Sequence, residues 1–181
     1  MRAVIVALRY SLGMSLCLLP WNAYAQGNSD VHCVLDEASV MAFGQYDPMS
    51  TTPLDVQGRV SYRCDNGQRG NGYGQGQNQG HGQGQGQPKD PLTLQIALST
   101  GQAGTFQRYM SGGRDRLKYN LYLDPVRTIV WGDGTGGTQV YTAHAQPNGH
   151  VVVVPVFGRV VPEQDVADSS YVDTIIVTLD F

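Results

Sequence analysis

The sequence has little of what most enzymes and nucleic-acid-binding proteins contain. Charged residues are 15% of the 181 residues, and acidic side chains outnumber basic ones, so no basic surface for nucleic acid or anionic lipid is expected. No serine lies in a Gly-x-Ser-x-Gly motif, and no acidic cluster has the spacing of a calcium loop. The histidines occur singly, at His32, His81, His144 and His150. We therefore expect no enzymatic activity, no cofactor and no metal site.

Helical periodicity is also missing, and this bears on the glycine-rich stretches. Gly132–Gly137 loosely resembles a phosphate-binding loop. Such a loop needs a helix N-terminus behind its glycines, whereas the residues that follow, Thr138–Thr142, favour a strand. The sequence therefore argues against nucleotide binding.

One long apolar run is present, from Ala3 to Leu19, and Arg9 interrupts it. It is short for a membrane span and is followed by Ala23-Tyr24-Ala25, which is typical of a signal-peptide cleavage site. Cys17 does not indicate a lipoprotein, because the large Leu16 precedes it. We predict that residues 1–25 are a signal peptide and that the mature chain, residues 26–181, is exported.

The mature chain would have 156 residues, enough for one domain, with 10 basic and 15 acidic side chains. Its two cysteines, Cys33 and Cys64, would reach an oxidising compartment, where thiols pair. A metal site is the alternative, but His32 is the one nearby histidine. We predict a disulfide that stabilises the domain by about 3 to 4 kcal/mol in the chain-entropy model.

Segments of alternating polarity recur along the mature chain, separated by Gly, Pro, Asn and Asp. About seven strands in one domain of this size predict an all-β, immunoglobulin-like sandwich. The predicted strands are Ala38–Phe43, Val56–Cys64, Leu92–Leu98, Leu117–Leu123, Thr128–Trp131, Val151–Val161 and Tyr171–Phe181.

The segment Gly67–Pro88 interrupts this pattern with nine glycines and seven glutamines among 22 residues, and Tyr73 is its one aromatic side chain. It has too little apolar surface to offset its chain entropy, so we predict a disordered loop inserted between two strands. An extended polar loop that touches a surface is the functional alternative.

The last predicted strand, Tyr171–Phe181, has the clearest alternation in the sequence. Its apolar face is interrupted once, by Asp173. No lysine or proline protects this strand, and an unprotected strand edge is a template for another chain. A place in the middle of a finished sheet is the alternative. The residues on the apolar face are Tyr171, Ile175, Val177, Leu179 and Phe181.

Several short motifs follow one another along the mature chain: Cys33, Phe43–Pro48, Gly58, Cys64, Leu98–Gly101, Arg108–Met110, Leu117–Tyr122, Trp131–Gly134 and Tyr171–Thr178. In this order they resemble the spore coat protein U domain family, which supplies subunits of archaic chaperone-usher pili. The resemblance spans nearly the whole mature chain except the Gly/Gln-rich insert.

The resemblance implies an incomplete immunoglobulin-like sandwich that lacks its last strand and is completed by a donor strand. Its implied partners are a periplasmic pilus chaperone, an outer-membrane usher and the neighbouring subunit, whose N-terminal extension supplies the donor strand. The strand Tyr171–Phe181 would form one wall of the acceptor groove, and the protein would pass from the periplasm to a fimbria on the cell surface.

A donating subunit needs an alternating apolar extension before its first cysteine, and residues 26–32 contain one aliphatic residue, Val31. We therefore expect a tip subunit that accepts a donor strand without giving one. Tip subunits usually carry cell adhesion and biofilm attachment, which makes Tyr73 and Trp131 the candidate surface contacts. The alternatives are a self-complete secreted sandwich that binds carbohydrate or coats a surface, and a spore coat component.

Overall fold

The structure is a computed structural model that describes residues 4–10, 31–66 and 92–181. These residues form ten strands and one short 3-10 turn, η1, so the all-β prediction is confirmed. The predicted insert Gly67–Pro88, with Tyr73, lies outside the described residues. The elements are β1 Val4–Tyr10, β2 Val31–Ala38, β3 Met41–Gly44, β4 Leu54–Asn66, β5 Thr93–Leu98, η1 Gly101–Ala103, β6 Tyr109–Gly112, β7 Asp115–Tyr122, β8 Tyr141–His144, β9 Asn148–Val160 and β10 Tyr171–Asp180.

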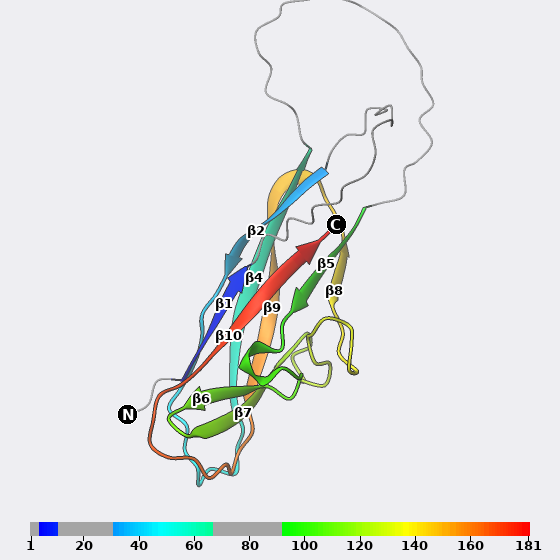
Figure 1. Cartoon of the computed structure of the whole chain (residues 1–181). Helices are drawn as coiled ribbons and strands as arrows, with labels where there is room; N and C mark the ends of the chain where they lie inside the picture. The colour runs from blue at the N-terminus through cyan, green and yellow to red at the C-terminus, as the bar shows by residue number, and fades with distance from the viewer. Residues whose placement is uncertain (1–3, 11–30, 67–91) are drawn as a thin grey trace, which may run out of the picture.

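The strands follow one hydrogen-bonded path, β2-β4-β9-β7-β6-β10-β1-β3, with β5 joining β10 and β8 joining β5. The path folds over, so that β4 and β9 form a layer behind β10 and β5 (Figure 1). Aromatic rings pack across this sandwich: the ring of Tyr62 in β4 lies 6.4 Å from that of Tyr141 in β8, and the ring of Phe43 in β3 lies 5.9 Å from that of Tyr119 in β7.

Two of the predicted strands are wrong in detail. The predicted strand Ala38–Phe43 is divided, because the chain leaves β2, which pairs with β4, and enters β3, which pairs with β1. The predicted strand Thr128–Trp131 contains only isolated β-bridges. The carboxylate of Asp124 accepts hydrogen bonds from the backbone N–H groups of Thr128 and Ile129, and these bonds close a tight turn instead. The remaining predicted strands correspond to β4, β5, β7, β9 and β10.

Two glycines let β3 lie close against the other layer. A Cβ atom on Gly158 in β9 would stand 2.7 Å from the ring of Phe43, and one on Gly58 in β4 would stand 2.7 Å from the side chain of Met41. Both distances are below van der Waals contact. The small residues therefore allow Met41 and Phe43 to fill the core beneath β3, where both are buried.

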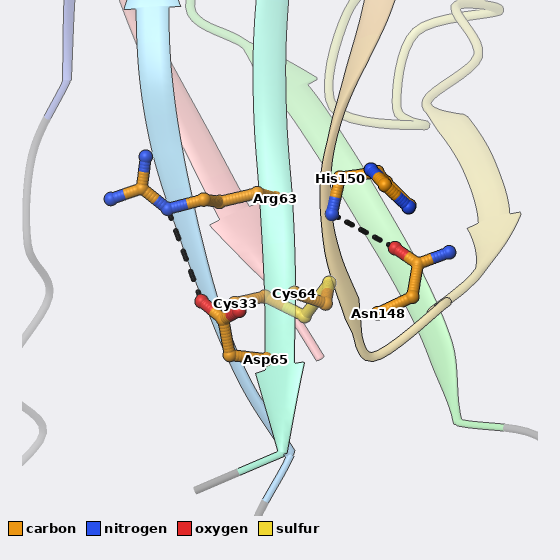
Figure 2. The surroundings of a disulfide bond; sticks show 6 residues. All are labelled: Cys33, Arg63, Cys64, Asp65, Asn148 and His150. Carbon is orange, nitrogen blue, oxygen red and sulfur yellow. Dashed lines mark hydrogen bonds and ion pairs between the residues drawn. A yellow bond between two sulfur atoms is a disulfide. The ribbon is translucent and has the colours of Figure 1, made fainter.

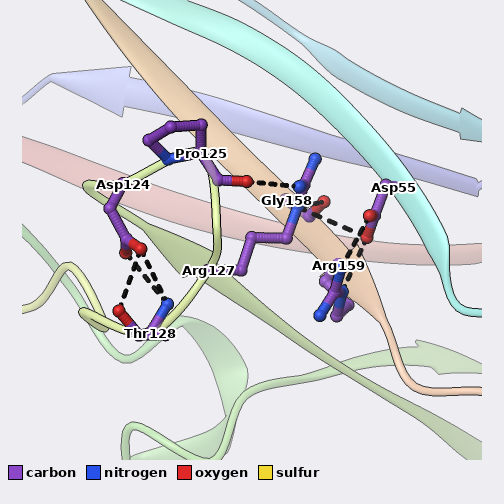
Figure 3. A network of polar contacts seen from close by, with 7 residues as sticks. All are labelled: Asp55, Asp124, Pro125, Arg127, Thr128, Gly158 and Arg159. Atoms are coloured by element: carbon purple, nitrogen blue, oxygen red, sulfur yellow. Dashed lines mark hydrogen bonds and ion pairs between the residues drawn. The ribbon is translucent and has the colours of Figure 1, made fainter.

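The outer face of the β4–β9 pair carries a polar network (Figure 3). Arg159 donates two hydrogen bonds of 2.8 Å to the carboxylate of Asp55, its partner in the ladder, and Arg127 lies 3.3 Å from the same carboxylate. The Arg159 hydrogen bond, with a contribution from the Arg127 charge, lowers the pKa of Asp55 below its ordinary value. The network fixes the turn that contains Arg127 on the end of β9.

Cys33 in β2 and Cys64 in β4 are paired residues of one ladder and form a disulfide, as predicted (Figure 2). Both cysteines are buried. The two cysteines are 31 positions apart in the sequence, and the bond links β2 covalently to β4.

Replacing Cys33 and Cys64 together with serine is expected to lower the free energy of unfolding by about 2 to 5 kcal/mol, because the unfolded chain regains the closed-loop entropy. Urea unfolding of the oxidised chain measures the change. A reducing agent should destabilise the native chain and leave the double variant unaffected. Equal stability of the native and variant chains would contradict the expectation.

Candidate functional site: the two edges of strand β10

Strand β10 lies at the centre of the candidate site. Its alternation is as the sequence predicts: Tyr171, Ile175 and Val177 are almost fully buried, whereas Val172 and Ile176 are 45% and 43% exposed. Toward the end of the chain Leu179 is half-buried, and Phe181 is 50% exposed, 6.4 Å from the ring of His32. The apolar face of β10 therefore belongs to the core up to Val177 and reaches solvent beyond it.

Asp173, the exception on that face, is completely buried. Its carboxylate accepts hydrogen bonds from the Tyr119 hydroxyl at 2.8 Å and from the backbone N–H of Gln102 at 3.0 Å. A side chain on Gly101, whose φ is 64°, would collide with this carboxylate. Burial, followed by the nearby Asp173 charge, raises the pKa of Tyr119. Asp173 thus fastens β10 to β7 and η1 from within the core.

One edge of β10 is held firmly by residues of the chain itself. The backbone N–H of Ser99 donates to the carbonyl of Ile176 at 2.9 Å, and the Ser99 hydroxyl accepts from the N–H of Ile176 at 2.9 Å. Gln102 donates to the carbonyl of Val172, and β5 pairs with β10 from Val177 onward.

Arg108, which is 1% exposed, supports that edge from below. Its guanidinium donates to the carbonyls of Ser99 at 2.7 Å and Trp131 at 2.9 Å and to the side-chain oxygen of Asn120 at 2.8 Å. Burial lowers the pKa of Arg108 to about 10, so the group keeps its charge at neutral pH. The charge is compensated by these oxygens, as a buried charge requires. Sequence reasoning did not identify Arg108 as a structural residue, although it lies in one of the quoted motifs.

The other edge of β10 has a different neighbour. Residues 4–10, predicted as part of a signal peptide, form β1, which runs parallel to β10 from Tyr171 to Val177. The far side of β1 pairs antiparallel with β3. In the described chain β1 is therefore the strand that joins β10 to β3.

The predicted surface contact at Trp131 is wrong for the side chain. Trp131 is completely buried, and its indole N–H donates to the carbonyl of Ile96 at 2.8 Å. Its ring packs 6.1 Å from that of Tyr141. The glycine-rich turn follows Trp131 in the sequence, and the indole itself belongs to the core.

The turn after Trp131 borders an open cavity of about 790 Å³. Its lining includes Thr105, Phe106, Gln107, Asp133 and Thr135. The hydroxyl and amide groups of Thr135 bind the Asp133 carboxylate, which lowers the pKa of Asp133. The cavity thus combines one aromatic ring, a carboxylate and several side chains that can form hydrogen bonds.

Across residues 4–10, 31–66 and 92–181, no group of three or more His, Cys, Asp or Glu side chains is placed to hold a metal ion. Within the same ranges, no helix has both the length and the apolar character needed to cross a membrane.

Residues 23–178 match the spore coat protein U domain, and the chain belongs to this family. The predicted family resemblance is therefore confirmed, and the match extends from the segment before β2 to Thr178 in β10.

Protein U of Myxococcus xanthus is 36% identical over 67 residues, which are 37% of this chain and 35% of that protein. The match thus covers about a third of either protein.

Among solved structures, the chain is similar to the complex of CsuC and CsuE from Acinetobacter baumannii, a chaperone and tip adhesion subunit of archaic chaperone-usher Csu pili. The TM-score is 0.47 at 16% identity, covering 84% of this chain and 40% of that one. At these values the similarity does not bear on the partners or function of the present chain.

Proposed function

We propose that the protein is a structural subunit of a chaperone-usher pilus and that it accepts a donor strand between β10 and β3. Membership of the spore coat protein U domain family supports the class. The observation that carries the proposal is the position of β1: β10 and β3 are joined through a strand that belongs to the predicted signal peptide. Once residues 1–25 are removed, that position needs another occupant.

The physical consequence is an unfinished core. Without a strand beside it, β10 would lose the backbone hydrogen bonds of its ladder with β1, and polar backbone groups without partners in an apolar groove are costly. Tyr171, Ile175 and Val177 would border the opening with the side chains of Met41 and Phe43 from β3. A strand from a chaperone, and later from a neighbouring subunit, would supply hydrogen bonds and apolar side chains together.

The test is expression of residues 26–181 in the periplasm, alone and together with the chaperone of the same pilus system. We expect soluble protein only with the chaperone, as a one-to-one complex that a donor-strand peptide releases. A soluble, cooperatively folded monomer without the chaperone would contradict the proposal. The outer-membrane usher, as the site of assembly, belongs to the same proposal.

The tip position is part of this proposal. Residues 26–32 have too few apolar side chains to fill an acceptor groove, so the subunit would receive a strand and donate none. Adhesion would then be carried by surface loops, and the predicted insert Gly67–Pro88 is the candidate. Cysteine crosslinking between residues 26–32 and a neighbouring groove is the decisive measurement, because a crosslink would exclude the tip position.

A second candidate function, carbohydrate binding, is favoured by the cavity beside the turn that follows Trp131. Sugars present apolar C–H faces and many hydroxyl groups. An aromatic ring such as Phe106, with the polar groups of Gln107 and Asp133 around it, suits both.

Replacing Gln107, an exposed residue of this cavity, with alanine is expected to weaken glycan binding about tenfold, since one hydrogen bond of typical strength is lost. Binding of the full chain to a glycan array, followed by titration calorimetry, provides the measurement. Gln57→Ala, an exposed change on β4, is the matched control and should bind as the native chain does. Absence of glycan binding by the native chain would remove this candidate.

A further inference from the structure

Strand β1 pairs with its neighbours in a defined register. Val4 to Tyr10 lie opposite Tyr171 to Val177, residue by residue, in a parallel ladder of seven pairs. On the other side, Val6, Ile5 and Val4 lie opposite residues Met41, Ala42 and Gly44 of β3. The segment therefore has hydrogen-bonded partners on both edges, which is the environment of an interior strand.

The register also matches the alternation of the two sequences. Residues paired in a ladder share a face of the sheet. The β10 residues that are buried lie opposite Val4, Val6, Leu8 and Tyr10, and those that are exposed lie opposite Ile5, Ala7 and Arg9.

The position of Arg9 is the informative one. In the register of β1, Arg9 is paired with Ile176, which is exposed, and Leu8 is paired with Ile175, which is buried. The one charged residue of the segment is therefore paired with an exposed residue of β10.

We infer that residues 4–10 have a second role besides export, as an intramolecular donor strand that closes the domain while they remain attached. A chain that retains them is a closed monomer, and their removal exposes the acceptor edge of β10. This inference rests on the proposed function, because it assigns an occupant to the same edge. It concerns a different form of the protein, the chain before processing.

The experiment compares two full-length variants, each refolded from denaturant under oxidising conditions. Leu8→Asn changes a residue opposite the buried Ile175, and Ile5→Asn changes a residue opposite the exposed Val172. The two substitutions remove isomeric side chains and introduce the same one, so both lower the apolarity of the segment equally. Light scattering after size exclusion gives the monomer fraction, and urea unfolding gives the midpoint.

We expect Leu8→Asn to lose most of its monomer and to show a folded-to-unfolded ratio reduced by about tenfold or more, whereas Ile5→Asn behaves as the native chain does. A peptide with the sequence of residues 3–11, added during refolding, should restore the monomer of Leu8→Asn. Equal behaviour of the two variants would overturn the inference.

The outcome is separable from that of the proposed function. If the chain lacking residues 1–25 still requires its chaperone while both full-length variants aggregate alike, the acceptor edge stands and the role of residues 4–10 is lost. If the chain lacking residues 1–25 folds as a stable monomer, the acceptor edge itself is lost.

Discussion

Arg108→Met is expected to lower the free energy of unfolding by about 3 kcal/mol or more, because it removes the guanidinium donor from the buried carbonyl of Trp131 and the partly buried carbonyl of Ser99. The guanidinium serves the carbonyls of Ser99 and Trp131 and the side chain of Asn120. Methionine fills much of the same volume, so the loss reports the missing hydrogen bonds. Urea unfolding of the full chain measures the change.

Arg108→Lys separates charge from geometry. Lysine keeps a positive charge but cannot reproduce the planar fork of donors, so it should recover only part of the loss. Arg114→Met, on an exposed turn, is the matched control and should change stability by no more than about 0.5 kcal/mol.

The effect of Arg108 should extend to β10 through Ser99, which bonds both the N–H and the carbonyl of Ile176. Faster hydrogen exchange at the Ile176 amide in Arg108→Met would reveal this coupling. Unchanged stability in Arg108→Met would show that the buried carbonyls find other donors, and the assigned role of Arg108 would be wrong.

The sequence was sufficient to predict the class of fold and its last strand. Alternation along Tyr171–Phe181 required no knowledge of distant residues, since each position is decided by its neighbours two residues away. The disulfide could also be predicted, because an exported chain with two cysteines allows only one intramolecular pairing. The strand boundaries between β2 and β3 could not, because they depend on which sheet receives the chain at Ser39 and Val40.

The hydrogen bonds that hold β10 in place join residues far apart in the sequence, so they could not be predicted from it. Asp173 appears in the sequence as a break in an apolar face, but its partners Tyr119 and Gln102 lie 54 and 71 positions away. Arg108 resembles any other loop arginine until its backbone acceptors are in place.

The segment Val4–Tyr10 shows a different limit. A short apolar run is compatible with an export signal and with a strand, and periodicity over seven residues does not separate them. The ladder with β10 was needed to show that alternate residues of this segment are paired with the buried residues of β10.

Trp131→Ala is expected to cost about 3 to 5 kcal/mol, as removal of a large buried aromatic side chain usually does. The indole is completely buried beneath the turn that borders the cavity. Trp131→Phe keeps most of the apolar volume and leaves the carbonyl of Ile96 without its donor, so its cost should be smaller, about 1 to 3 kcal/mol. Val126→Ala, at a residue that is 70% exposed, is the control and should be nearly neutral.

The two variants also decide between a core role and a surface role for Trp131. If Trp131 has a core role, surface attachment falls only in proportion to the amount of folded protein. Attachment per folded molecule is then the same in Trp131→Phe as in the native chain. A surface role would give Trp131→Phe native stability with reduced attachment. Parallel measurement of urea unfolding and of surface attachment separates the two roles.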